Sequence, residues 1–249
     1  MSKYSTSILF IILLTQGCGS AKQISTQDQT DYNSSKELPW KYKALLIAGD
    51  QSITAFDNAR ITFKKYLLRK GIKAKNIREL SRKKYYGNKK IALTTKKNIE
   101  ASLKSLNVDG NTACLVFMSS HGSTSGFLIE NESTVKPGEL NRWLLKYCGS
   151  QPTILIVSAC YSGLFAMKVM KHPNRIILTA ARHDKTSFGC GVENEYTYYD
   201  GCLIRNLNSS SNWNEVAEKN IRCVDKKEFD EKSHPQVFIG SDVEKLSLP

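Results

Sequence analysis

This sequence has no long hydrophobic run, no Cys-x-x-Cys pair and little histidine. Its longest apolar stretch, Ile8–Leu14, has seven residues, whereas a transmembrane helix needs about 20. There are no cysteine pairs at zinc-ligand spacing and only four histidines, so we expect no bound metal. These absences argue against a membrane-spanning protein and against a zinc protein.

Acidic residues are also scarce. There are 23 Asp and Glu against 36 Lys and Arg, which gives a formal net charge of +13. Such an excess favours contact with anionic lipid headgroups, nucleic acid or acidic proteins. The basic residues are scattered, however, with short clusters only at Arg82–Lys84 and Lys89–Lys90. No RNA-binding motif accompanies them, so we interpret the surplus as a solvated basic surface and expect no specific nucleic-acid partner.

The N-terminal segment is typical of an export signal. Lys3 precedes the apolar run, and small or polar residues then lead to Cys18. The stretch Leu14–Cys18 resembles a bacterial lipobox, a signal whose cysteine is acylated and becomes the first mature residue. The resemblance implies a signal peptide over residues 1–17 and a membrane anchor on Cys18. Gly19 in place of the usual inner-membrane Asp implies the outer membrane, facing the periplasm, if the cell is Gram-negative.

The rest of the chain divides into a tether and one domain. Residues 18–38 are rich in Ser, Gln, Asp and Thr and are predicted to be a flexible tether. Residues 39–249 contain the core-forming segments, with no repeat and no second domain. At 41% hydrophobic and 24% charged residues overall, the composition is that of a globular protein.

Apolar runs and amphipathic stretches alternate along this domain. Strands are predicted at Lys43–Ala48, Asn76–Leu80, Ala113–Met118, Thr153–Ser158, Arg175–Thr179 and Gln236–Ile239. Helices are predicted at Asp57–Leu68, Thr95–Leu106, Pro137–Tyr147, Gly163–Met170, Tyr196–Asn206 and Asn212–Cys223. Near-continuous apolar strands between helices indicate an α/β fold, a three-layer sandwich whose mostly parallel central sheet is flanked by helices.

A histidine and a cysteine each follow a predicted central strand. Parallel sheets place their sites at the carboxyl ends of the strands, which is where His121 and Cys160 fall. A nucleophilic cysteine must be a thiolate, and both an imidazole and the start of the predicted 163–170 helix would favour the charged sulfur. The backbone amides of Gly122 and Cys160 could hold a developing oxyanion. We therefore predict His121 and Cys160 as a catalytic pair.

Three segments around these residues resemble legumain-type peptidases. Phe117–Ser123 contains the family's His-Gly-Ser motif, Ser158–Gly163 its Ala-Cys-x-Ser-Gly motif, and Thr179–Cys190 its Thr-Ala-Ala segment. In this order they resemble legumains more than caspases, over roughly Lys43 to Gly240. The resemblance implies the caspase-haemoglobinase fold and a cysteine endopeptidase that cleaves protein or peptide substrates through a thioester acyl-enzyme, after Asn or Asp. It implies no metal and no organic cofactor.

The predicted substrate pocket departs from the legumain pattern. The position of the family's pocket acid, two residues before the nucleophile, is Ser158 here. Asp200 is near the position of a second pocket acid, although a surface acid is an alternative interpretation. The family's pocket arginine is absent from Ser52 to Phe56, and Arg60 lies within a predicted helix. The residue preference therefore stays open.

Other interpretations of the chain remain. A transamidase would use the same pair, and a catalytically silent lipoprotein that binds a ligand or an anionic polymer needs no active thiol. If Cys18 carries lipid and Cys160 is the nucleophile, five of the seven cysteines remain, so at least one is unpaired. Cys114, in an apolar run, is predicted to be a buried thiol. His183 and Asp184 are predicted to lie in a surface loop.

Overall fold

The computed structural model describes residues 40–83, 85–86, 89–129 and 133–249. The predicted signal peptide, the predicted lipidation site Cys18 and the predicted tether lie outside the described residues. The domain limits therefore stay a prediction.

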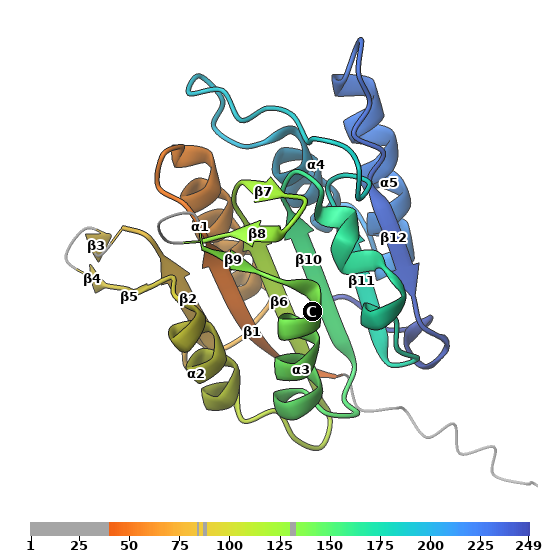
Figure 1. Cartoon of the computed structure of the whole chain (residues 1–249). Helices are drawn as coiled ribbons and strands as arrows, with labels where there is room; N and C mark the ends of the chain where they lie inside the picture. Colours follow the sequence, from red (N-terminus) through yellow and green to blue (C-terminus); the bar gives the residue numbers. More distant parts are fainter. Residues whose placement is uncertain (1–39, 84, 87–88, 130–132) are drawn as a thin grey trace, which may run out of the picture. The chain divides into compact units, whose positions relative to one another are not determined.

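A seven-stranded sheet forms the centre of the fold, in the order β12-β11-β10-β6-β1-β2-β5 (Figure 1). Every neighbouring pair is parallel except β11 and β12, which are antiparallel. The mostly parallel sheet predicted from the sequence is thus confirmed. Its strands are β1 (Lys41–Ala48), β2 (Ile77–Ser81), β5 (Ala92–Leu93), β6 (Thr112–Ser119), β10 (Thr153–Ser158), β11 (Arg175–Thr179) and β12 (Gln236–Ile239).

The burial and the order of the strands around β6 indicate where a site can form. All residues of β6 and β10 are buried, as expected for strands covered on both faces. The chain runs from β1 to β2 on one side, and later returns to β6 on the other side of β1. In open α/β sheets, ligands bind where the strand order reverses in this way, at the carboxyl ends of the strands.

Helices cover both faces of the sheet (Figure 1). One core contains apolar residues of α1, α4 and α5, among them Phe63, Leu203 and Trp213. The other contains residues of α2 and α3, among them Leu103 and Leu144. The three-layer sandwich is therefore confirmed. The helices are α1 (Thr54–Arg69), α2 (Lys96–Leu106), α3 (Pro137–Tyr147), α4 (Tyr198–Leu207) and α5 (Trp213–Lys227).

The helix predicted over 163–170 is wrong. Two short 3-10 helices, η2 (Ser162–Ala166) and η3 (Lys168–Met170), replace it. The extended backbone of Met167, with ψ at 169°, interrupts them. Gly163 also packs directly on the following loop, because a Cβ there would lie 2.4 Å from the backbone nitrogen of His183. This contact and the hydrogen bond from the Ala181 N–H to the Ser162 hydroxyl, at 3.0 Å, fix the turn to the loop after β11.

Several short elements were not predicted. They are β3 (Tyr85–Tyr86), β4 (Lys89–Lys90), β5, β7 (Gly122–Ser123), β8 (Gly126–Leu128), β9 (Thr134–Val135), η1 (Ala74–Asn76) and η4 (Ser241–Val243). Segments of two or three residues are too short to show a hydrophobic period. The small sheet β7-β8-β9 begins at Gly122 and continues the chain directly from the end of β6.

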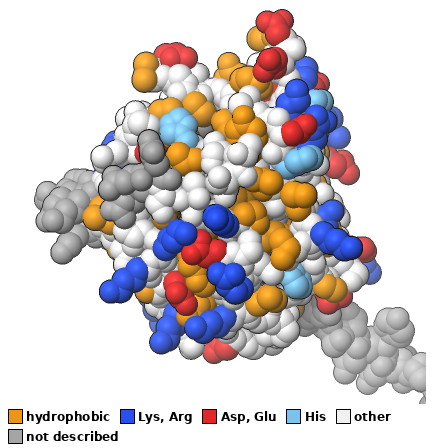
Figure 2. Space-filling model, in the orientation of Figure 1, with side chains coloured by type: hydrophobic (Ala, Val, Ile, Leu, Met, Phe, Trp, Pro, Cys, Tyr) orange, Lys and Arg blue, Asp and Glu red, His pale blue; other side chains and the backbone are white. Residues whose placement is uncertain are grey.

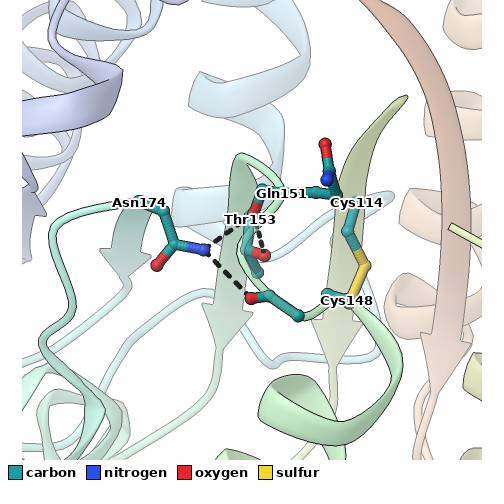
Figure 3. The surroundings of a disulfide bond; sticks show 6 residues. Cys114, Cys148, Gln151, Thr153 and Asn174 are labelled. Carbon is teal, nitrogen blue, oxygen red and sulfur yellow. Dashed lines mark hydrogen bonds between the residues drawn. A yellow bond between two sulfur atoms is a disulfide. The ribbon is translucent and has the colours of Figure 1, made fainter. Parts of the chain in front are cut away.

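Cys114 is not a free thiol, contrary to the sequence prediction. It forms a disulfide with Cys148, which joins β6 to the end of α3 (Figure 3). The prediction failed because an apolar run shows that a cysteine is buried but not what it faces. A second disulfide, Cys202–Cys223, joins α4 to α5. Among the described cysteines, Cys160 and Cys190 are free.

The described surface carries mixed charges. Over α2 and α3, Lys and Arg alternate with Asp and Glu, whereas hydrophobic and uncharged side chains dominate around β7 and β8 (Figure 2). Ion pairs such as Lys96–Glu139, at 2.9 Å, account for part of this mixture. Among the described helices, none combines the length and the apolar composition needed to cross a membrane.

Candidate active site

The ends of β6 and β10 bring the two predicted catalytic residues together. Ser119 and Ser158 are paired partners at the last position of the two strands. The Ser120 N–H then donates to the Ser158 carbonyl at 3.1 Å. His121 and Cys160 each follow within two residues of this pair, so they lie at the same edge of the sheet.

Gly122 packs directly against the backbone of the predicted nucleophile. A Cβ at this position would lie 2.0 Å from the Cys160 carbonyl oxygen and 3.0 Å from the Ala159 Cβ. No side chain fits there. The glycine of the His-Gly motif therefore allows the two strand ends to approach each other.

Gly122→Ala is expected to lower the free energy of unfolding by about 2 kcal/mol, since an extra methyl must displace backbone. Gly138→Ala is the matched control, because this residue is in α3 and a Cβ there would meet no heavy atom within 4 Å beyond its own helix backbone and chain neighbours. Urea unfolding of both variants measures the difference. Equal stability of the two variants would show that the strand ends are not so closely packed.

The Cys160 thiol is half-buried and contacts one residue, Ser187, of the loop between β11 and α4. The Ser187 N–H donates to Sγ at 3.3 Å, and the Ser187 hydroxyl lies 3.6 Å from it. The next residue, Tyr161, has a left-handed backbone with φ at 58°. Its N–H donates to the Lys185 carbonyl at 2.7 Å. The turn that carries the thiol is thus held by the loop that contains the legumain-like Thr-Ala-Ala segment.

The imidazole of His121 contacts two residues that the sequence did not single out. Its Nε2 lies 3.1 Å from the Ser52 hydroxyl, and its ring meets the Phe56 ring edge-on at 5.1 Å. Both residues follow β1, the strand next to β6. The only signal for them in the sequence is their place after a predicted central strand.

Asp200 is buried, so its interpretation as a surface acid is wrong. The Ser119 hydroxyl donates to its Oδ2 at 2.7 Å, while Oδ1 has no hydrogen-bond partner. Burial raises the pKa of Asp200 to about 6, although the hydroxyls of Ser119, Ser158 and Thr197 favour the charged form. Ser158 itself is buried, with its hydroxyl 3.4 Å from that of Thr197. The two predicted pocket residues therefore lie close together beneath the end of the sheet.

The other candidate groups lie apart from this arrangement or are inert. Burial raises the pKa of the Cys190 thiol to about 12, and the nearby Cys160 and Asp200 add to the effect. Cys190 is therefore protonated at neutral pH. Arg60 is buried and bonded to the carboxylates of Asp57 and Glu79. Asp184 is exposed and pairs with Arg182 at 2.6 Å, and the neighbouring His183 is exposed as predicted.

A half-buried thiol and an imidazole at the ends of adjacent strands of such a sandwich are typical of caspase-like cysteine peptidases. The crystal structure of caspase-1 from Spodoptera frugiperda is similar, with a TM-score of 0.61 over 80% of this chain and 86% of that chain, at 13% identity. No curated protein sequence matches the chain.

The particular family follows from the sequence. The model of the peptidase C13 family, the legumain family, matches residues 48–238. The chain belongs to this family and is a legumain-like cysteine-type peptidase with a caspase-like fold.

Proposed function

We propose that the protein is a cysteine endopeptidase that works through Cys160 and His121 and a thioester acyl-enzyme. The observation that carries the proposal is the junction of β6 and β10, where Gly122 lies against the backbone of Cys160. A nucleophile and a base must lie within reach of one scissile carbonyl. The pairing of the two strand ends in register supports this assignment.

The proposed reaction has two halves. The Cys160 thiolate attacks the substrate carbonyl, and the N–H groups of Gly122 and Cys160 stabilise the oxyanion. The C–N bond then breaks while His121 gives its proton to the leaving amine. A water next gives a proton to His121 and attacks the thioester, and the C–S bond breaks to restore the thiolate.

The thiolate of Cys160 must be stabilised by nearby groups. The sequence prediction assigned part of this stabilisation to the 163–170 helix, which is not formed. A helix dipole over 163–170 is unavailable because η2 has only five residues. The Ser187 N–H, at 3.3 Å from Sγ, is a donor of the kind that favours a thiolate, and the imidazolium of His121 favours it further. Ser187 thus takes over the supporting role in this proposal.

We assign substrate selection to Asp200 and Ser158. An ionised Asp200 would accept hydrogen bonds from the side-chain amide of Asn before the scissile bond. A substrate Asp would be repelled by the ionised form but could bond to the protonated one. Since the pKa of Asp200 is raised to about 6, cleavage after Asp would require pH below about 6.

The proposal includes the place of the enzyme and one alternative reaction. Acylation of Cys18 would anchor the domain to the bacterial cell envelope, where exported proteins are the substrates.

If an amine reaches the thioester before water, the same pair performs transamidation. Adding a peptide with a free amino terminus to the assay separates the two outcomes, because only a transamidase yields the joined product.

Iodoacetamide is expected to inactivate the full chain by modifying Cys160 and not Cys190. The reagent attacks thiolates, and the pKa of about 12 keeps Cys190 protonated. Peptide-library cleavage before and after alkylation, with mass mapping of the modified cysteine, measures both effects. The residue before each cut reports the pocket preference.

Two results would contradict the proposal. Full cleavage after complete carbamidomethylation of Cys160 would exclude a Cys160 nucleophile. No cleavage of any library peptide, from pH 4 to pH 8, would instead favour the silent binding protein.

A further inference from the structure

The loop between β1 and α1 makes a polar contact with His121 that the mechanism above does not use. The Ser52 hydroxyl lies 3.1 Å from His121 Nε2. The same hydroxyl donates to Asp50 Oδ1. The backbone N–H of Ser52 donates to the same carboxylate oxygen at 2.7 Å. Asp50, Ser52 and His121 therefore form a continuous hydrogen-bonded chain.

Counting the protons of Asp50, Ser52 and His121 fixes the direction of each hydrogen bond between them. A carboxylate accepts hydrogen bonds and donates none, so the single proton of the Ser52 hydroxyl is given to Asp50. The hydroxyl oxygen can then only accept from His121. A neutral imidazole has one N–H, which must be on Nε2. Its Nδ1 is left with a free lone pair.

The surroundings keep Asp50 ionised. Burial alone would raise the pKa of Asp50, but the two hydrogen bonds from Ser52 and the nearby His121 lower it below its ordinary value. Phe56 packs edge-on against the imidazole with an interplanar angle of 84°. The ring of His121 is thus held both by a polar contact at Nε2 and by an apolar contact from α1.

We propose that Ser52 and Asp50 are positioning residues that hold His121 as the Nε2–H tautomer, so that Nδ1 exchanges the proton with Cys160 and the leaving amine. This inference rests on the proposed function for the identity of the proton donor and acceptor. Removing a residue that orients a functional imidazole through a hydrogen bond typically changes activity by about 10- to 100-fold. Neither residue has to touch the substrate.

The tautomer can be measured without any substrate. In the full chain carrying Cys160→Ala, long-range ¹H–¹⁵N spectra above the titration of the imidazole should show His121 protonated at Nε2. The His121 signals are assigned by their loss in a His121→Ala variant. Adding Ser52→Ala should give a mixture of tautomers, whereas Ser52→Thr, which keeps the hydroxyl, should preserve the Nε2–H form.

Steady-state kinetics test the positioning role a second time, in the chain that keeps Cys160. Ser52→Ala is expected to lower kcat by roughly 10- to 100-fold with little change in KM, and Ser52→Thr should restore most of kcat. Ser241→Ala is the matched control. Its hydroxyl also donates to a neighbouring carboxylate, that of Asp242, at 2.9 Å, and it follows β12 at the opposite end of the sheet.

The outcomes separate this inference from the proposed function. An Nδ1–H tautomer in the parent chain, or an unchanged kcat in Ser52→Ala, would overturn the positioning role. A fall in kcat without any change of tautomer would also overturn it, because the role acts through the tautomer. If no peptide is cleaved by the parent chain, the proposed function fails while the spectra still decide the tautomer.

Discussion

Replacing Cys160 with alanine is expected to reduce kcat/KM by about 10⁴-fold or more, because covalent catalysis is lost altogether. The substitution removes one sulfur from a half-buried position and leaves the hydrogen bonds of the strand ends intact. The fold should therefore persist, and circular dichroism can check that it does. The expected loss lies in kcat, since Cys160 forms its bond only after the substrate is bound.

The same substitution at Cys190, the other free thiol among the described residues, is the natural control. Cys190→Ala should keep most of the activity, because a thiol whose pKa is raised to about 12 is not a nucleophile at neutral pH. His121→Ala should resemble Cys160→Ala, and the double variant should be no worse than either, since the two residues act as a unit. Residual cleavage by Cys160→Ala within 100-fold of the parent chain would disprove the assignment.

The sequence predicted the large elements well for a physical reason. The bounds of α3, β10, β11 and β12 agree with the predicted ranges. Each is set by a strong local signal, such as the apolar run Thr153–Ser158 or Pro137 at the first position of a helix. The order of such elements is enough to define a mostly parallel sheet. His121 and Cys160 then follow from their positions after the strands.

The features that the sequence did not predict depend on contacts between residues far apart in the sequence. The 163–170 segment has helix-forming residues, but Gly163 is pressed against the backbone of His183, which no local pattern reveals. Ser52 lies in a short loop without any period, so its contact with His121 is visible only in space. Cys114 shows the same limit, because its burial could be predicted and its bond to Cys148 could not.

Asp200→Asn is expected to stabilise the protein at pH 8 by about 3 kcal/mol, because each tenfold change in a dissociation constant corresponds to about 1.4 kcal/mol. The buried carboxyl has its pKa raised from 3.8 to about 6. The folded protein therefore keeps a proton between these values that the unfolded chain has lost. For the parent chain, the contribution of Asp200 to the free energy of unfolding is greatest below about pH 4. It falls as pH rises to about 6, and above that it is lower by about 3 kcal/mol.

An asparagine at position 200 cannot titrate, so the Asp200→Asn variant should lack this contribution to the pH dependence of the free energy of unfolding. At pH 4 the two proteins should be equally stable, because a protonated Asp and an Asn have similar shape and the Ser119 hydroxyl can bond to either. Urea unfolding at pH 4, 6 and 8 measures the difference, with Asp242→Asn as an exposed control that should change little.

A stability cost at neutral pH needs a compensating role, which the proposed pocket supplies. A carboxylate with one unpartnered buried oxygen is a strong acceptor for a substrate amide, because a donor that reaches it relieves the penalty of burial. Asp200→Asn should therefore gain stability and lose selectivity in the same change, with kcat/KM for Asn-containing peptides falling relative to other peptides. If stability rises and the residue preference does not change, the buried acid belongs to the core and the pocket must be built from other residues.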